Sequence, residues 1–302
     1  MKWLIAFVAC VSLVSAKEPV RPKIVGVPHL AVYAKDLDKS RAFYRDFLGY
    51  EEPATGKSTY FKINDRQFLK LLPEKEPESD RLSHISLETE DVNAMRGYLL
   101  SRGVVVPAKV EKDDLGNLIL NVQDPEGHTV EFVQYRPDSL LAKSRGKHLP
   151  NGRVSKRLMH VGIIVTKLDP AMKFYTDVLG FREFWRGSST GTELSWINLK
   201  VPDGEDYIEL MLYKEPPAAT ARGSAHHQCL EVPDVQAALA ALEAKPYRKE
   251  YTRPLEVRTG RNRKRQLNLF DPDGTRTELM EPVTVDGNPA PSSDAPPPDR
   301  HR

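Results

Sequence analysis

The chain has 302 residues, of which 40% are hydrophobic and 28% are charged, a composition that excludes fibrous, wholly disordered and multi-span membrane proteins. Its 44 Lys and Arg residues nearly balance 42 Asp and Glu residues and are spread along the chain, so we expect no nucleic-acid partner. At about 150 residues per domain, this length predicts two domains, each large enough to bury its own core.

The N-terminal segment differs from the rest of the chain. Lys2 is followed by an apolar run from Trp3 to Val14, and small residues come at Ser15 and Ala16. This pattern is typical of a cleavable signal peptide over residues 1–16. The run is also shorter than the roughly 20 residues that a spanning helix needs. We therefore expect a secreted or periplasmic protein without a membrane span.

The two cysteines give no internal disulfide if this signal is removed. Cleavage takes away Cys10 and leaves Cys229 alone, so stability must come from packing. In the apolar context Gln228-Cys229-Leu230, we expect Cys229 to be a small core residue and not a nucleophile.

One segment recurs after 131 residues without a gap. It opens with alternating apolar stretches at 28–34 and 159–165, which predict β-strands. A helix follows each strand, with Asp38 or Asp169 as the predicted N-cap and Gly49 or Gly180 at the predicted left-handed C-terminal position. The residues His29, Leu37, Asp38, Phe43, Tyr44, Asp46, Leu48 and Gly49 match His160, Leu168, Asp169, Phe174, Tyr175, Asp177, Leu179 and Gly180.

A second pattern recurs after 147 residues and predicts a strand, a tight turn and another strand. The turns are Asp-Pro-Glu-Gly and Asp-Pro-Asp-Gly, in which Pro and Gly occupy positions that favour a sharp reversal. The strand after each turn, 129–132 or 277–279, carries a Glu. The residues Asn121, Asp124, Pro125, Gly127 and Glu131 match Asn268, Asp271, Pro272, Gly274 and Glu278.

Strand and helix patterns beginning at 82–87 and 226–232 complete four modules, each a strand, a helix and further strands. Turn formers and charges interrupt the periodicity at 136–156, which we interpret as a linker. The last residues, 282–302, include six prolines, and we expect the tail 283–302 to be disordered. The approximate limits of the modules are 24–74, 81–135, 157–214 and 224–282.

This arrangement resembles the vicinal oxygen chelate (VOC) superfamily, which includes glyoxalases, bleomycin-resistance proteins, fosfomycin-resistance enzymes and extradiol dioxygenases. The resemblance covers nearly all of the chain between the predicted signal peptide and the tail. It implies an α+β fold in which four βαβββ modules pair into two glyoxalase-like domains, 24–135 and 157–282. It also implies metal ligands that point inward from the first and last strands of each module.

In the second domain these positions hold two histidines and two glutamates. A buried imidazole or carboxylate costs several kcal/mol unless something pairs with it, and a divalent cation offsets that cost. Nitrogen and oxygen ligands suit Fe, Mn, Ni or Zn as the divalent transition metal. The predicted metal ligands of the second domain are His160, Glu209, His227 and Glu278.

In the first domain the corresponding metal ligands are His29, His84 and Glu131, and the fourth position holds Lys70. Two histidines and one carboxylate form the facial set of non-haem iron oxygenases. Lys70 would bring a positive charge toward a cation. Three alternatives stay open for this site: it is empty, it binds an anionic substrate, or Lys70 is used in salt bridges.

The complete second-domain set resembles that of glyoxalase and implies a metal-dependent lyase or isomerase. Its substrate would be a small oxygenated molecule chelated through vicinal oxygens, with Glu209 or Glu278 as the catalytic base. A small-molecule partner is expected, and a homodimer is an open alternative.

Two other functions are open. An extradiol ring-cleaving dioxygenase ranks second, because 111–117 and 258–265 contain no acid/base His, and Asn121 and Asn268 stand where such enzymes usually carry Tyr. The third is a non-catalytic small-molecule-binding protein like the bleomycin-resistance proteins, which generally lack the ligand set.

Overall fold

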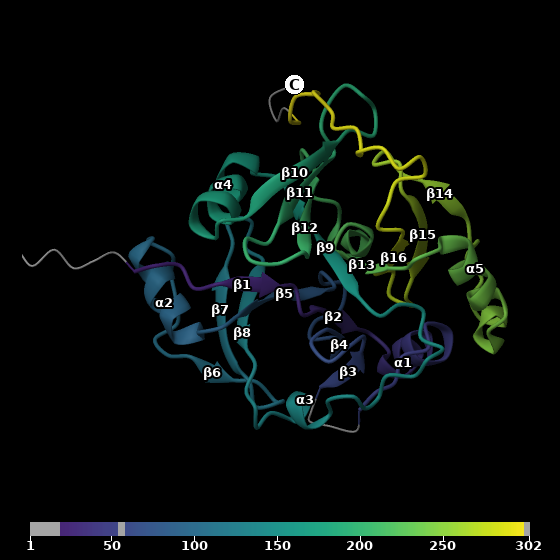
Figure 1. Cartoon of the computed structure of the whole chain (residues 1–302), viewed down its shortest axis with the longest axis horizontal. Coiled ribbons are helices and arrows are strands. Elements are labelled where there is room, and N and C mark those ends of the chain that lie inside the picture. Colours follow the sequence, from purple (N-terminus) through teal and green to yellow (C-terminus); the bar gives the residue numbers. More distant parts are fainter. Residues whose placement is uncertain (1–18, 54–57, 299–302) are drawn as a thin grey trace, which may run out of the picture.

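Two curled, mixed β-sheets make up the structure, one from each half of the chain (Figure 1). The structure is a computed structural model that describes residues 19–53 and 58–298. The predicted signal peptide, residues 1–16, lies outside these described residues. Within the described ranges, no helix is both long enough and apolar enough to cross a membrane.

The first sheet is centred on the antiparallel strands β2 and β5, each of which has a parallel neighbour on its outer side. Its strand order is β3-β4-β2-β5-β8-β7-β6, and β1 pairs with β5 off this path. The strands are β1 (Ile24–Gly26), β2 (Leu30–Ala34), β3 (Thr59–Lys62), β4 (Phe68–Pro73), β5 (Leu82–Thr89), β6 (Glu111–Lys112), β7 (Leu118–Gln123) and β8 (Thr129–Gln134).

The second sheet repeats this plan around the antiparallel pair of β9 and β13, whose parallel neighbours are β12 and β16. Its order is β10-β11-β12-β9-β13-β16-β15-β14. The strands are β9 (Leu158–Val165), β10 (Arg182–Gly187), β11 (Trp196–Lys200), β12 (Tyr207–Leu212), β13 (His227–Glu231), β14 (Val257–Thr259), β15 (Arg265–Phe270) and β16 (Arg276–Met280).

The predicted α+β fold is confirmed, because each sheet joins two modules that follow one another along the chain. Three modules have three strands after their helix, and the first has only β3 and β4 there among the described residues. The helices are α1 (Leu37–Ala42), α2 (Val92–Ser101), α3 (Leu140–Lys143), α4 (Leu168–Met172) and α5 (Val235–Glu243). Shorter helical turns are η1 (Phe43–Phe47), η2 (Lys173–Val178), η3 (Ala219–Ser224) and η4 (Pro246–Lys249).

The ends of α1 and α4 show which local signals the chain uses. Asp36, and not the predicted Asp38, caps α1, because its carboxylate accepts hydrogen bonds from the backbone N–H groups of Asp38 and Lys39. Asp38 and Asp169 lie in the first turn of their helices, where the helix dipole favours an acidic side chain. At the C-terminal ends, Gly49 and Gly180 have φ values of 80° and 79°, which is the predicted left-handed conformation.

The hydrophobic core is continuous between the two halves of the chain. The first module packs against the fourth, where the ring of Phe47 lies 4.8 Å from that of Tyr251. Two equivalent hydrogen bonds also cross the interface: the Tyr44 hydroxyl donates to Asp271 at 3.1 Å, and the Tyr175 hydroxyl donates to Asp124 at 2.9 Å. Each sequence repeat therefore supplies a tyrosine to the turn of the opposite half.

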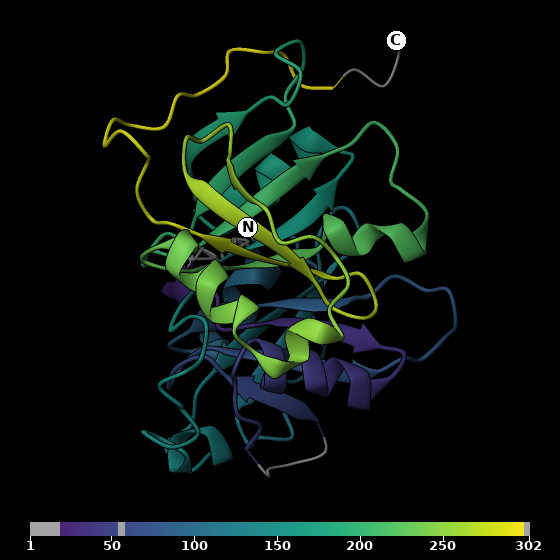
Figure 2. The same cartoon turned by 90° about the vertical axis from the view of Figure 1, so that its right-hand side faces the viewer.

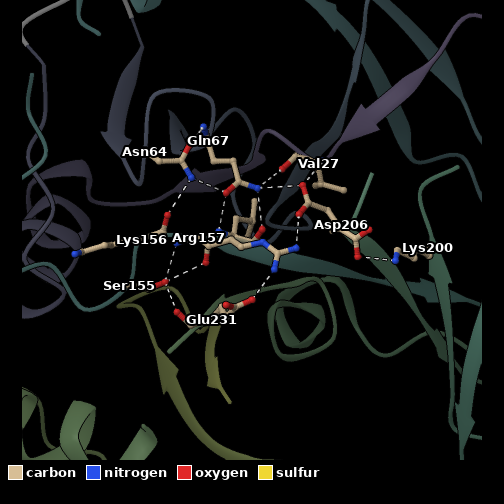
Figure 3. Close-up of polar contacts among 11 residues, drawn as sticks. Val27, Asn64, Gln67, Ser155, Lys156, Arg157, Lys200, Asp206 and Glu231 are labelled. Atoms are coloured by element: carbon tan, nitrogen blue, oxygen red, sulfur yellow. Dashed lines mark hydrogen bonds and ion pairs between the residues drawn. The ribbon is translucent and has the colours of Figure 1, made fainter. Parts of the chain in front are cut away.

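A polar network at the interface ties the start of β9 to the first sheet (Figure 3). The amide of Gln67 donates to the backbone oxygen of Leu158 at 2.8 Å and accepts from its N–H at 2.9 Å. The same amide donates to the backbone oxygen of Val27. Beside it, Arg157 pairs with Asp206 at 3.0 Å. Gln67 thus satisfies backbone groups from both halves.

The two segments that we predicted to lack regular structure both make ordered contacts. The linker forms α3 and packs against the first sheet, with Lys62 donating to the backbone oxygen of Ser144 at 2.7 Å. The described part of the tail runs over β10, where the N–H of Ser293 donates to the backbone oxygen of Arg186 at 3.0 Å (Figure 2). The composition of the tail favours disorder, but the described part of it is ordered. Backbone hydrogen bonds stabilise this proline-rich segment although it buries few side chains.

Candidate metal centres

Four side chains converge on the inner face of the second sheet, which is the face opposite its helices. They are His160 on β9, Glu209 on β12, His227 on β13 and Glu278 on β16. The Nε2 atoms of the two histidines are 3.1 Å apart. A Glu278 oxygen lies 3.5 Å from Nε2 of His160, and a Glu209 oxygen lies 3.5 Å from Nε2 of His227. The structure therefore brings together all four residues predicted for this site.

Strand register explains this convergence. Gly162 on β9 pairs with Glu209 on one side and with His227 on the other. One step along the sheet, Cys229 pairs with both His160 and Glu278. Directly opposed residues of neighbouring strands point to the same face of the sheet. These two sets of paired residues are neighbours on that face, so all four side chains meet there.

Gly162 provides the space that the His227 ring occupies. A Cβ atom built at Gly162 would overlap the ring of His227 and would also lie 2.9 Å from the backbone oxygen of Ala225. That same oxygen is 2.8 Å from Nδ1 of His227, which places the ring proton on Nδ1 and leaves the lone pair of Nε2 facing the centre.

Burial sets the protonation of the group. It lowers the pKa of both His160 and His227 well below the usual value, with the Arg276 cation adding to the effect. Burial raises the pKa of Glu209 to about 8, and the neighbouring Glu278 contributes to that rise. Burial also raises the pKa of Glu278. The imidazoles are therefore neutral, as metal ligands must be, and Glu209 holds a proton near neutral pH that a cation would displace.

The residues at this centre can hold a metal ion. The ligand atoms of His160, Glu209 and His227 all lie within 4.8 Å of one another, as do those of His160, Cys229 and Glu278. Ligands about 2.1 Å from a shared ion lie roughly 3–4 Å apart, which matches the separations given above. Nε2 of His160 lies 3.1 Å from Nε2 of His227 and 3.5 Å from a Glu278 oxygen, so it is the His160 atom that an ion would contact.

Two further residues lie at this centre that the sequence analysis did not place among the metal ligands. Nη2 of Arg276 lies 2.9 Å from both ring nitrogens of His227. The signal for it was its position two residues before Glu278, on the same face of β16. The thiol of Cys229 lies beside Glu278, and burial raises its pKa well above the usual value. Cys229 is a fully buried residue, but it belongs to the centre and not only to the core.

The first sheet holds a similar group made of His29, which directly precedes β2, with His84 on β5 and Glu131 on β8. The Nε2 atoms of its histidines are 3.0 Å apart, and oxygens of Glu131 lie 3.4 Å and 3.8 Å from them. Burial lowers the pKa of His84 to about 3 and raises that of Glu131 to about 7. Ser86 donates to Glu131 at 2.9 Å, from the position that corresponds to Cys229. These three predicted residues also lie together and could hold an ion.

Lys70 stands in the register position of Glu209, because it pairs with Ala31 as Glu209 pairs with Gly162. Among the described residues, the Lys70 ammonium forms no ion pair, and it lies 5.5 Å from the centroid of the Tyr60 ring. The structure therefore does not support the third alternative, in which Lys70 is used in salt bridges.

Paired βαβββ modules with inward-facing histidines and carboxylates define a class of small-molecule metalloprotein folds. The family model described as the "Glyoxalase/Bleomycin resistance protein/Dioxygenase superfamily" matches residues 26–132 and 157–279. The chain belongs to this superfamily.

Individual relatives cover parts of the chain at moderate identity. It is 31% identical over 133 residues to the uncharacterized protein YaeR of Escherichia coli, an alignment that spans 42% of this chain and 96% of the relative. It is 29% identical over 116 residues to the metallothiol transferase FosB of Lysinibacillus sphaericus, which spans 36% of this chain and 82% of the relative.

Solved structures match the whole two-sheet arrangement. The Mn(II)-bound glyoxalase from Novosphingobium aromaticivorans has a TM-score of 0.67 at 18% identity, over 92% of this chain and 89% of that one. Several 2,3-dioxygenases have TM-scores of 0.62 to 0.66 at 15 to 21% identity. At these identities the likeness establishes the fold alone.

Proposed function

We propose that the second domain is a divalent-metal-dependent lyase or isomerase that acts on a small molecule bound through two neighbouring oxygens. The observation that carries this proposal is the convergence of His160, Glu209, His227 and Glu278. The two histidine Nε2 atoms are 3.1 Å apart, and each carboxylate has an oxygen 3.5 to 4.0 Å from both of them. The Mn(II)-bound glyoxalase and the metallothiol transferase among the similar proteins support a role for metal.

A divalent ion bound here would polarise the oxygens of the substrate. Of the two carboxyls, Glu209 is the better placed to move a proton. Both carboxyls line a small cavity of about 60 Å³, but Glu209 forms no hydrogen bond with another described residue, whereas Glu278 accepts a hydrogen bond from the Cys229 thiol. Glu209 would remove a proton from a carbon next to a carbonyl and return it to a neighbouring atom. Arg276, which lines the same cavity, adds positive charge where an oxyanion would develop.

The metal part of this proposal is tested by elemental analysis of purified protein. We expect His227→Ala to lower the metal affinity of the second centre by tenfold or more, since removing a ligand costs at least as much as removing its supporting group, which typically costs about 10- to 100-fold. The control is His148→Ala, whose imidazole lies in the linker and pairs with Glu51. Equal metal content in both variants and in the unchanged protein would exclude the second centre.

The proton-transfer part is tested by hydrogen exchange in D₂O with small α-hydroxyketones, followed by NMR. We expect metal-dependent exchange at the carbon next to the carbonyl, and we expect Glu209→Gln to reduce it by about 10²–10⁴-fold, the usual contribution of a general base. Retention of metal in this variant separates a lost base from a lost ligand. Unchanged exchange in a variant that still holds metal would remove Glu209 from the mechanism.

Extradiol-type oxygen chemistry is the second candidate. It is favoured by the group of two histidines and one carboxylate in the first sheet. The fold shared with 2,3-dioxygenases gives it structural support. We expect weak or absent oxygen uptake with catechols and Fe(II), because the described residues place no further histidine at either centre. Strong uptake would promote this function over the first.

We also propose that the protein is exported, on the strength of the signal-like segment at residues 1–16. Cleavage after Ala16 would make Lys17 the first residue of the mature chain. N-terminal sequencing of protein from the periplasm or the medium tests this directly. Intact protein retained in the cytoplasm would contradict it.

A further inference from the structure

A second, larger cavity lies next to the second-domain centre. Its volume is about 460 Å³, within the range of small-molecule sites. It shares Trp185 and Asn262 with the small cavity at the centre, so the two spaces adjoin. Its aromatic wall includes Tyr207, whose ring lies 4.5 Å from the ring of His160. The Tyr207 side of the cavity therefore packs against His160, a residue that would hold the metal ion.

The other wall is formed by the C-terminal tail, residues 282–290. The tail leaves the sheet after β16 and passes over toward β10, as the yellow segment in Figure 2 shows. Hydrogen bonds fix it at the far side, where Trp185 donates to the backbone oxygen of Pro291 at 2.9 Å. An ion pair between Arg263 and Asp286 at 2.8 Å fixes it at the near side. The tail thus encloses space beside the centre.

Polar groups in this cavity lack partners in the protein. Lys264 is half-buried, and its ammonium forms no hydrogen bond or ion pair with another described residue. The side chain of Asn198 is 4% exposed, and its Oδ1 atom is buried without a hydrogen-bond partner. Leaving the buried Asn198 oxygen unpaired is costly, and the Lys264 ammonium can accept an anionic partner without first breaking an ion pair.

The lining combines one cation with flat apolar surfaces. The rings of Phe184 and Tyr207 meet edge to face at 5.1 Å, and Phe184 is 52% exposed, so its ring is accessible to a ligand in the cavity. Aromatic rings favour planar ligands that stack or meet them at an edge. An ammonium at the same site selects an anionic group.

We propose that this cavity binds a planar carboxylic acid, whose ring packs against Trp185, Tyr207 and Phe184 and whose carboxylate pairs with Lys264. This inference deepens the proposed function and rests on it for one point only, that the bound acid is the substrate of the adjoining centre. The acid would place its remaining oxygens toward His160 and Glu209.

The test is calorimetric titration of the full-length protein with 2-naphthoate and with its neutral amide, in EDTA and again with Mn²⁺. We expect naphthoate to bind at least tenfold more tightly than the amide. Lys264→Gln should abolish this preference by weakening naphthoate at least tenfold, and Lys264→Arg should retain it. The matched control is Lys249→Gln, an exposed lysine of the same domain.

Each outcome decides one point. Absence of naphthoate binding, or equal affinity in Lys264→Gln and the unchanged protein, overturns the proposed cavity. Persistent amide binding by Lys264→Gln shows that the variant is folded. Because the EDTA arm contains no metal, naphthoate binding there supports the cavity even if the metal centre fails its own test.

Discussion

At the scale of single residues, Gly162 determines whether the second centre can form. Its missing side chain leaves room for the ring of His227, which must lie across β9 to reach His160. The equivalent residue in the first sheet, Ala31, carries a Cβ, and there His84 is 9% exposed where His227 is fully buried. The two centres therefore differ in how deeply their second histidine is seated.

We expect Gly162→Ala to lower metal affinity at the second centre by at least tenfold, because the added methyl group displaces His227 from the position that its partner Ala225 fixes. Metal analysis by isothermal titration measures this. Gly97→Ala is the control, since a Cβ at Gly97 meets no atom within 4 Å and the change gains up to about 1 kcal/mol of helix stability. Full metal retention in Gly162→Ala would contradict the account.

The buried carboxyls predict how the stability of metal-free protein depends on pH. The pKa values of Glu131 and Glu209 are raised to about 7 and about 8 by burial, so the folded state keeps their protons at pH values where the unfolded state has lost them. Stability from these groups is present at low pH and is lost as pH rises through the raised values. The buried histidines act in the opposite direction, but only below their usual pKa of about 6.5.

In EDTA, we therefore expect the thermal midpoint to fall between pH 6.5 and pH 8.5. Glu209→Gln should flatten this slope, because an amide does not ionise. Added Mn²⁺ should reverse the slope, since ionised carboxylates bind the cation. A midpoint that rises over this interval without metal would show that these carboxyls ionise normally in the fold.

At the scale of elements, the sequence predicts the strands well because they repeat. The landmarks separated by 131 residues place His29 and His160 at equivalent positions, and those separated by 147 do the same for Glu131 and Glu278. Alternation along a strand then decides which side chains face inward. The same strand-then-helix pattern also locates the other two histidines. His227 is the first residue of β13, which precedes α5, and His84 lies in β5, which precedes α2.

The path of the tail could not be predicted in the same way. Its residues carry no apolar periodicity, and it contacts β10 and Leu194 through its own backbone N–H and carbonyl groups, which do not depend on side-chain type. Arg276 and Lys264 were missed for a related reason. An isolated charge in a sequence is most often solvated, and only the fold shows that these two face a cavity.

We expect removal of residues 291–302 to loosen the tail and open the larger cavity. Three hydrogen bonds are lost, from Trp185 to Pro291, from Ser293 to Arg186 and from Leu194 to Pro296, at about 1 kcal/mol each. Thermal unfolding should shift down, and Trp185 emission should move to longer wavelength as water enters. Removing only residues 299–302 is the control. Identical spectra for both truncations would show that the tail does not enclose the cavity.

At the scale of the whole molecule, the two halves are joined by equivalent contacts. Tyr44 reaches Asp271 and Tyr175 reaches Asp124, and both aspartates begin the tight turns that the sequence predicts. This exchange between opposite halves could not be predicted from periodicity, since it depends on how two complete sheets dock. Burial raises the pKa of Asp271 to about 6, so the hydrogen bond from Tyr44 partly replaces the lost hydration.

We expect Tyr44→Phe to destabilise the protein by about 1.5–3 kcal/mol, the usual loss for a hydrogen bond to a charged group. Chemical denaturation measures this change. Combining Tyr44→Phe with Asp271→Asn should cost less than the sum of the two single changes, because the partners interact directly. Tyr33→Phe, on β2 and outside this contact, is the control. Strict additivity would show that Tyr44 and Asp271 stabilise the fold independently.

The contacts between Gln67 and the start of β9 determine how the two halves would behave if the chain were cut between them. One glutamine from the first half completes the backbone hydrogen bonding of Leu158 in the second, and the reciprocal tyrosines interlock the two. A chain cut at the linker should therefore yield two fragments that bind each other and reassemble into one complex.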